Sequence, residues 1–186
     1  MKYLLFVVLI FTASGLIAQK KFTEYDDTFK KYSKRFFGPG YDWKLFKAQS
    51  MAESSLLPEA VSPVGARGLM QLMPSTFADV QSANPEFDNI DDPVWNIAAG
   101  IYYDRQLYKA WKEIAESDEK FRFTFGSYNA GRGTILKAQE KAKDKNLDHT
   151  DWENISIVAP EVPRWRHEET LSYVEKINKF HTQLLK

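Results

Sequence analysis

The sequence predicts a mainly α-helical domain, with at most a small β-hairpin near residues 61–70. Apolar and aromatic residues recur at intervals of three and four along most of the chain, which is the spacing of one helix face. Glycine and proline separate these stretches, and no stretch alternates apolar and polar residues over the length of a strand. One compact domain is expected, because the chain has 186 residues of which 44% are hydrophobic.

Most of the expected helices have a recognisable start or end. Asp42 is placed to cap the second helix, and Asp92, which precedes a proline, is placed to cap the fourth. Residues 61–68 contain two glycines and a proline and are expected to form a turn. Residues 138–152, rich in lysine and aspartate, and residues 157–166, which contain two prolines, are expected to form surface connections between helices. The expected helices cover residues 22–36, 42–53, 75 onward, 93–107, 117 or 118 to 129, 134–143 and 168–185.

Composition excludes several classes of function. The chain has no cysteine, so it has no disulfide scaffold, thiol nucleophile, iron–sulfur cluster or cysteine-ligated zinc site. The 25 basic and 25 acidic residues cancel, which argues against nucleic-acid binding. His149, His167 and His181 do not stand at metal-ligand spacing, and no glycine pair follows a predicted strand. No metal and no cofactor are therefore expected.

The start of the chain differs from the rest. Lys2 is followed by an apolar stretch, residues 3–17, which is short for a membrane-spanning helix and has small residues near its end. This layout is typical of a signal peptide cleaved after Ala18, which predicts a signal peptide at 1–18 and a single domain at 19–186. Export to the periplasm or cell envelope is then expected. An uncleaved membrane anchor is the alternative, and only in that case is membrane association expected.

One carboxyl group has distinctive neighbours. Glu53 ends a largely apolar predicted helix and is followed by a loop rich in glycine and proline; residues 53–76 read ESSLLPEAVSPVGARGLMQLMPST. This stretch closely resembles the catalytic core of lytic murein transglycosylases, the goose-lysozyme-like enzymes that cut peptidoglycan. Three further blocks resemble those of the same family in order and spacing. They are a helix at 96–107, YNAG at 128–131 and ET-x-x-Y-V at 169–174.

The resemblance covers residues 50–177, and the stretch FGPGYDWKLFKAQSMAES is similar to the membrane-bound F-type branch. It implies a lysozyme-like fold and a glycan substrate cut at the β-1,4 linkage between MurNAc and GlcNAc. Glu53 matches the position of the single catalytic acid and base. Seven residues match positions that line the cleft or lie near it: Ser62, Gln71, Met73, Tyr128, Asn129, Glu169 and Tyr173.

Structural roles alone would also explain several of these residues. Met73 and Leu69 suit a hydrophobic core, Ser62 suits the cap of a turn before proline, and Tyr128 suits packing between helices. These alternatives stay open from the sequence. The expected partner is the peptidoglycan glycan strand, bound by a monomer. Its carboxylates are expected to meet local basic groups such as Arg132, Arg164 and Arg166.

A single carboxyl group suffices if the substrate supplies the second reacting group. Most glycosidases use two carboxyl groups, about 5–5.5 Å apart in retaining enzymes and about 6.5–9.5 Å apart in inverting ones. The N-acetyl oxygen of MurNAc can replace one of them in a substrate-assisted reaction. Glu53 would protonate the glycosidic oxygen and then accept the proton of the C6 hydroxyl, which closes a 1,6-anhydro ring.

This role requires Glu53 to hold a proton near neutral pH. Its pKa must therefore rise from about 4.3 toward 6 or more, and partial burial beside Leu69, Met73 and Tyr128 is expected to raise it. Two other functions remain open. A hydrolytic lysozyme of the same fold would use water in place of the C6 hydroxyl, and a non-catalytic peptidoglycan-binding module would not need Glu53 at all.

Overall fold

The computed structural model describes residues 22–115 and 118–186. The predicted signal peptide lies outside the described residues. Within them the chain forms eight α-helices and one short 3-10 helix, and no strand. The α-helices are α2 (Asp26–Phe37), α3 (Lys44–Ser54), α4 (Pro74–Ala83), α5 (Pro93–Ala110), α6 (Asp118–Ala130), α7 (Arg132–Asp144), α8 (Trp152–Val158) and α9 (His167–Leu184), and the 3-10 helix is η1 (Ala159–Glu161).

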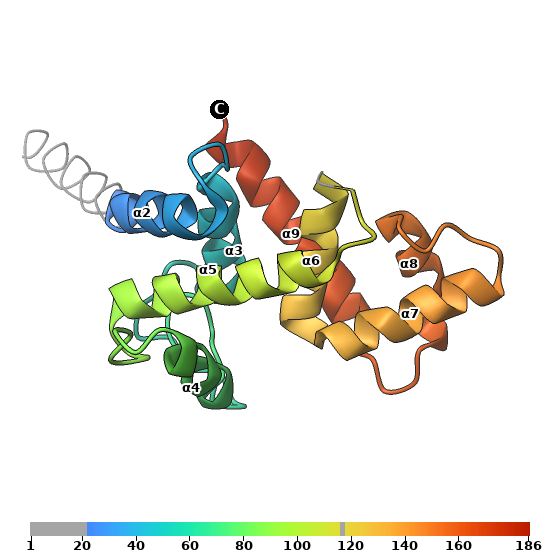
Figure 1. Cartoon of the computed structure of the whole chain (residues 1–186), viewed down its shortest axis with the longest axis horizontal. Helices are drawn as coiled ribbons and strands as arrows, with labels where there is room; N and C mark the ends of the chain where they lie inside the picture. The colour runs from blue at the N-terminus through green and yellow to red at the C-terminus, as the bar shows by residue number, and fades with distance from the viewer. Residues whose placement is uncertain (1–21, 116–117) are drawn as a thin grey trace, which may run out of the picture.

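The long helix α5 crosses the middle of the molecule, with α2 on one side and α4 on the other (Figure 1). Helices α6 and α7 continue from the end of α5, and α8 packs on α7. The last helix, α9, passes behind α6 and packs along α3. Residues near the two ends of the described chain therefore meet, and His181 Nε2 lies 2.8 Å from Asp42 Oδ2.

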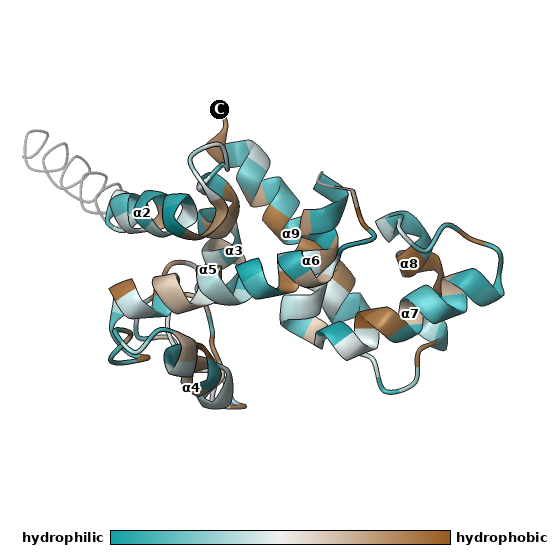
Figure 2. Ribbon diagram, in the orientation of Figure 1, coloured by the Kyte–Doolittle hydropathy of each residue, from teal (hydrophilic) through white to brown (hydrophobic). Residues whose placement is uncertain are grey.

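The core is rich in aromatic side chains. Phe37, Phe46, Tyr108 and Phe121 are buried and pack ring against ring, with centroids 4.8 Å apart for Phe37 and Phe46 and 5.0 Å apart for Tyr108 and Phe121. These rings come from α2, α3, α5 and α6, so one cluster joins four helices. Along α9 hydrophilic and hydrophobic stretches alternate (Figure 2), as in a helix that buries one face.

The mainly α class is confirmed, and the expected hairpin is reduced to two isolated antiparallel bridges, Val61 to Arg67 and Arg67 to Leu72. The cap at Asp92 is also confirmed, since its carboxylate accepts hydrogen bonds from the backbone amides of Val94 and Trp95. The cap expected at Asp42 lies one residue too early, because Trp43 is the cap residue of α3. Helix α3 begins at Lys44, and Asp42 Oδ1 accepts from the Lys44 amide at 2.9 Å while its other oxygen meets His181.

The surface connections expected at 138–152 and 157–166 are found only in part. Helix α8 covers the residues between these two segments and reaches into both, and its residues Trp152, Ile155 and Val158 are buried. Trp152 fits against Gly126 so closely that a Cβ on Gly126 would lie 2.2 Å from its ring. The helix is only seven residues long, so its apolar spacing is too brief to stand out from the polar residues around it.

Candidate active site

Glu53 stands in the last turn of α3, where the helix meets a loop. The two residues after the helix, Ser55 and Leu56, have positive φ values of 56° and 60°, so the chain leaves the helix sharply at this point. The backbone carbonyls at the end of a helix form the negative end of its dipole, which disfavours an ionised carboxyl group there. The position of Glu53 therefore already favours its protonated form.

The carboxyl group of Glu53 is held by Tyr173 on α9, whose hydroxyl donates a hydrogen bond of 2.6 Å to Glu53 Oε1. Burial raises the pKa of Glu53 from 4.5 to about 7, although the Tyr173 hydrogen bond and the nearby charge of Lys176 both lower it. Burial therefore outweighs two groups that favour the carboxylate. At neutral pH a large share of Glu53 keeps its proton, as a general acid must.

The loop after Glu53 is fastened to α3 itself. Ser50 and Ser54 are buried, and their hydroxyls donate to the Leu69 carbonyl oxygen at 3.0 and 2.9 Å. These serines lie on either side of Glu53 on α3, at positions that share one helix face. The expectation that Leu69 packs in the core is confirmed, since its side chain is fully buried. The loop is thus fixed across the helix end that carries Glu53.

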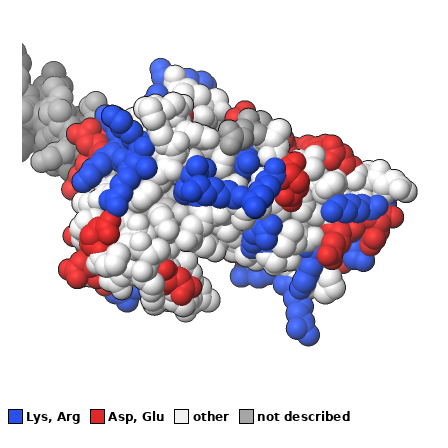
Figure 3. Space-filling view, in the orientation of Figure 1, with Lys and Arg blue, Asp and Glu red and all other residues white. Residues whose placement is uncertain are grey.

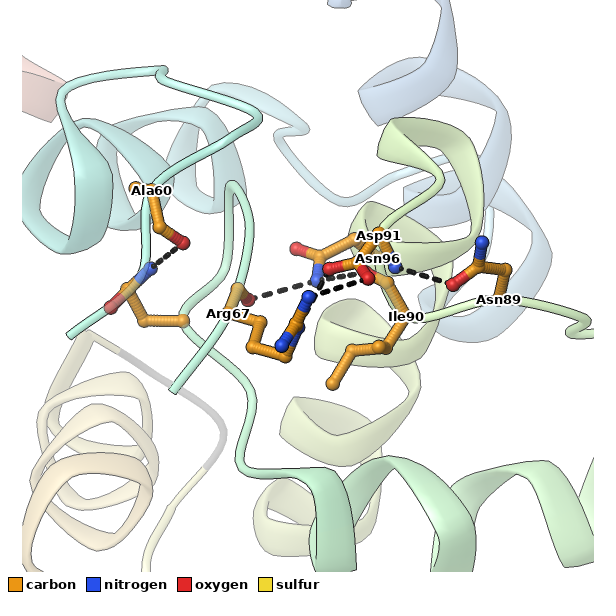
Figure 4. A network of polar contacts seen from close by, with 7 residues as sticks. Ala60, Arg67, Asn89, Ile90, Asp91 and Asn96 are labelled. Atoms are coloured by element: carbon orange, nitrogen blue, oxygen red, sulfur yellow. Dashed lines mark hydrogen bonds and ion pairs between the residues drawn. The ribbon is translucent and has the colours of Figure 1, made fainter. Parts of the chain in front are cut away.

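Asn96 ties the same loop to the start of α5 (Figure 4). Its side-chain amide donates to the carbonyl oxygens of Arg67 and Ile90 at 3.0 and 2.9 Å, and its oxygen accepts from the Met70 amide at 2.8 Å. Gly68 passes against this side chain with φ +75°, and a Cβ there would lie 2.4 Å from Asn96 Nδ2. Only glycine suits both the backbone angle and the space.

The predicted cleft residue Gln71 has φ +45°, a left-handed conformation that costs free energy for a residue with a side chain. Its amide nitrogen donates to the carbonyl oxygens of Ala60 and Gly68 at 3.1 and 2.9 Å. Its side-chain oxygen is left to accept a hydrogen bond from a ligand. Figure 4 shows the contact to Ala60 within the loop. The loop thus holds Gln71 in a single orientation.

Tyr128 closes the site from α6. Its hydroxyl donates to the Met70 carbonyl oxygen at 2.8 Å, and its ring packs on Tyr103 with centroids 5.3 Å apart. Burial raises the pKa of Tyr128 well above its usual value of 10, and the charge of Glu53 raises it further. Tyr128 therefore lies within electrostatic reach of Glu53 and stays a neutral phenol. The Tyr128 side chain therefore packs against α5 and the loop at Met70, and it also borders the proposed site.

Asn129 is exposed and is oriented from α9. Thr170 donates to Asn129 Oδ1 at 2.8 Å, and Trp165 donates to the Thr170 hydroxyl oxygen at 3.0 Å. Because Thr170 stands one helix turn before Tyr173, the same face of α9 reaches both Asn129 and Glu53. Trp165 also brings a residue of the expected surface connection at 157–166 into contact with the site.

Among the described residues, the side chains of three other predicted residues form no hydrogen bond with the site residues above. Ser62 accepts a hydrogen bond from the Ala66 amide at 2.9 Å and so caps the turn. Met73 is 39% exposed, so it is not part of the core, and it precedes α4. Glu169 is exposed and forms an ion pair of 2.8 Å with Arg166. Their roles in binding stay predictions.

The basic groups have varied surroundings. Arg132 donates to the Ala110 carbonyl oxygen at 3.2 Å and lies over the Trp111 ring, so it helps to join α5 and α7. Arg164 is exposed with φ +62°. On the face drawn in Figure 3, lysine and arginine side chains form several small groups with acidic side chains between them. In residues 22–115 and 118–186 no group of histidine and acidic side chains is arranged to hold a metal ion.

Two residues near Glu53 were not singled out from the sequence. Asp104 on α5 and Gln49 on α3 are fully buried, and Gln49 Nε2 donates to Asp104 Oδ1 at 3.2 Å. Gln49 precedes Glu53 by four residues, so the two share one face of α3. The only available signal was a charged residue at a core-facing position of the α5 pattern, beside Leu107 and Tyr108.

A helical domain in which a carboxyl group of raised pKa stands at a helix end under a fastened loop is typical of the lysozyme-like class. The family is the transglycosylase SLT domain, whose model matches residues 28–150, and the chain belongs to this family. Two membrane-bound lytic murein transglycosylases F are similar in sequence. The relative from Photobacterium profundum is 29% identical over 90% of this chain, and the one from Yersinia pestis is 31% identical over 77%. The chain spans about a third of the length of these relatives.

Solved structures show the same fold. The 70 kDa soluble lytic transglycosylase of Escherichia coli superposes with a TM-score of 0.64 at 24% identity, over 84% of this chain and 23% of that one. An inactive mutant of the lytic transglycosylase Slt from Pseudomonas aeruginosa gives a TM-score of 0.68 at 22% identity, over 88% of this chain and 24% of that one. The lysozyme-like architecture expected from the resemblance is therefore confirmed.

Proposed function

We propose that this chain is a peptidoglycan lytic transglycosylase that cuts the β-1,4 linkage between MurNAc and GlcNAc and leaves 1,6-anhydro-MurNAc ends. The observation that carries the proposal is the Glu53 carboxyl group, with a pKa of about 7 and a 2.6 Å hydrogen bond to Tyr173. Membership of the transglycosylase SLT domain family supports the reaction type. The names of the similar proteins support peptidoglycan, or murein, as the substrate.

In the first step, protonated Glu53 gives its proton to the glycosidic oxygen. The MurNAc N-acetyl oxygen attacks the anomeric carbon as the bond to that oxygen breaks, and the GlcNAc side leaves with a new hydroxyl group. The Glu53 carboxylate that remains is stabilised by the Tyr173 hydroxyl and by the positive charge of Lys176. These two groups thus act most strongly on the form of Glu53 that the first step produces.

In the second step, the Glu53 carboxylate takes the proton of the C6 hydroxyl. The C6 oxygen attacks the anomeric carbon and displaces the N-acetyl oxygen, so the 1,6-anhydro ring closes and Glu53 is protonated again. The closure is unimolecular, so it depends on how the sugar is held. We assign that task to Gln71, whose side-chain oxygen faces no protein donor in the described part of the chain, and to Asn129.

Digestion of purified sacculi followed by mass spectrometry tests the proposal. The parent protein is expected to release muropeptides with anhydro ends, which are lighter than reducing ends by one water. E53Q keeps the size of the side chain but has no proton to donate, so it is expected to release none. Reducing ends from the parent would indicate a hydrolytic lysozyme. Binding of sacculi without release by the parent would indicate a non-catalytic peptidoglycan-binding module.

We further propose that the protein is exported and acts in the periplasm or cell envelope, with residues 1–18 as a cleaved signal peptide. The apolar N-terminal stretch supports this, and so does the naming of similar proteins as membrane-bound lytic murein transglycosylases. None of the helices in residues 22–115 and 118–186 combines the length and apolar character needed to cross a membrane. Cell fractionation with N-terminal sequencing of the mature protein tests this proposal: a chain that begins at Gln19 supports it.

A further inference from the structure

The buried pair Gln49 and Asp104 has one hydrogen bond and two unsatisfied oxygens. Gln49 Nε2 donates to Asp104 Oδ1 at 3.2 Å, whereas Asp104 Oδ2 and Gln49 Oε1 are both enclosed without a hydrogen-bond partner. One additional donor between these two oxygens would satisfy both of them. A proton on Asp104 Oδ2 supplies that donor, because a carboxylic acid and a primary amide can form two hydrogen bonds with each other.

The surroundings of Asp104 favour the neutral acid. Its side chain is fully buried, and no lysine, arginine or histidine forms an ion pair with it among the described residues. The adjacent Arg105 directs its guanidinium over the rings of Phe37 and Tyr108, and Lys47 pairs with Asp26 at 2.6 Å. A buried carboxylate with one neutral hydrogen bond costs several kcal/mol, so such a group takes up a proton instead.

The titratable groups around Asp104 add to this preference. Burial raises the pKa of Asp104 well above its usual value, the Gln49 hydrogen bond lowers it, and the charge of Glu53 on α3 raises it further. Three tyrosines interact electrostatically with Asp104. Tyr103 on α5, Tyr128 on α6 and Tyr173 on α9 each have a raised pKa.

We propose that Asp104 is kept as a neutral carboxylic acid, doubly hydrogen-bonded to the Gln49 amide, and that this pair positions the turn of α3 that carries Glu53. Gln49 lies one helix turn before Glu53, so a fixed Gln49 anchors that turn to α5. A neutral Asp104 also leaves Glu53 as the single carboxyl group of the site that changes charge near neutral pH. An apolar environment can keep a carboxylic acid neutral at pH 7, so that it donates a hydrogen bond within an active site.

The proton on Asp104 is tested by the pH dependence of stability, without any measurement of activity. In an E53Q background, a neutral Asp104 binds a proton in the folded chain that the unfolded chain releases above about pH 4. Between about pH 5 and 7, this proton is expected to make the unfolding equilibrium constant of E53Q rise by an additional factor of about ten per pH unit. The constant of E53Q/D104N is expected to lack this additional rise. E53Q/D144N, which loses an exposed carboxyl group on α7, serves as the control and is expected to match E53Q. If the unfolding equilibrium constants of E53Q and E53Q/D104N depended equally on pH, the proposal would be overturned.

The positioning role rests on the proposed function of Glu53 and is tested by two further variants. D104N can make both hydrogen bonds to Gln49 and is expected to lose less than about threefold in kcat, with the basic limb of its pH profile unmoved. D104L fills the space without hydrogen bonds and is expected to lose on the order of tenfold to hundredfold in kcat, because Glu53 is no longer held in place.

Equal activity of folded D104N and D104L would refute the positioning role, and so would a basic limb that moves by a full pH unit in D104N. If D104L fails to fold, D104N still tests the charge state through its pH profile. If the parent releases no muropeptides, the proposed function fails, whereas the stability slopes still decide whether Asp104 carries a proton. The two failures are therefore distinguishable.

Discussion

Replacing Tyr173 by phenylalanine removes one group that lowers the pKa of Glu53. The Tyr173 hydroxyl donates to Glu53 Oε1 at 2.6 Å, and this hydrogen bond favours the carboxylate. A hydrogen bond to a charged group contributes about 1.5–3 kcal/mol, and one pKa unit corresponds to about 1.4 kcal/mol. A water molecule in the space left by the hydroxyl replaces some of this contribution, so we expect Y173F to raise the pKa of Glu53 by about one unit.

The assay is the pH dependence of kcat/KM on soluble peptidoglycan fragments, between about pH 5 and 9. Activity falls as Glu53 loses its proton, so the basic limb of Y173F is expected to lie about one pH unit higher than that of the parent. Y103F is the matched control, because Tyr103 packs on the Tyr128 ring and forms no hydrogen bond with Glu53. A basic limb of Y173F that stays in place or moves to lower pH would refute the reasoning.

Three other changes test the fold and the burial of Glu53. N96A removes the partners of the Met70 amide and the Ile90 carbonyl and one of the two hydrogen bonds to the Arg67 carbonyl, so it is expected to cost about 2–4 kcal/mol in the free energy of unfolding; a loss below about 1 kcal/mol, measured by urea unfolding, would contradict this. G126A forces a methyl group against Trp152 and is expected to cost about 1–3 kcal/mol, measured by thermal unfolding; an unchanged Tm would show that α8 packs elsewhere. E53Q is expected to gain stability relative to the parent as pH rises from about 4.5 to 7, by roughly 2–3 kcal/mol, since the folded parent holds a proton that its unfolded chain releases. A difference that shrinks over this range in denaturant titrations would contradict the raised pKa.

The sequence predicted the structure best where the reaction requires a particular residue type or where neighbouring residues alone determine the local structure. The spacing of Glu53, Tyr128 and Tyr173 along three helices was readable as motifs, and the structure joins two of them by a hydrogen bond. Helix class and the cap at Asp92 followed from local rules, because spacing and capping act over a few residues.

The sequence was least informative where contacts between distant segments decide the structure. The contact of Asp42 with His181, which lies 139 positions away, could not be predicted from the residues around Asp42. Helix α8 was missed because its stability depends on Trp152 filling the space beside Gly126. Asp104 reads as one charged residue in a helix, and only the packing of α5 on α3 shows that it is buried against Gln49.

The titration of the Glu53 carboxyl carbon by NMR tests the central claim most directly. Comparison of the parent with E53Q assigns the signal, and the account predicts a midpoint near pH 7, as burial in the last turn of α3 requires. A midpoint near the ordinary value of 4.5 would show that Glu53 has no proton to give at neutral pH. The proposed acid and base would then have to be another group.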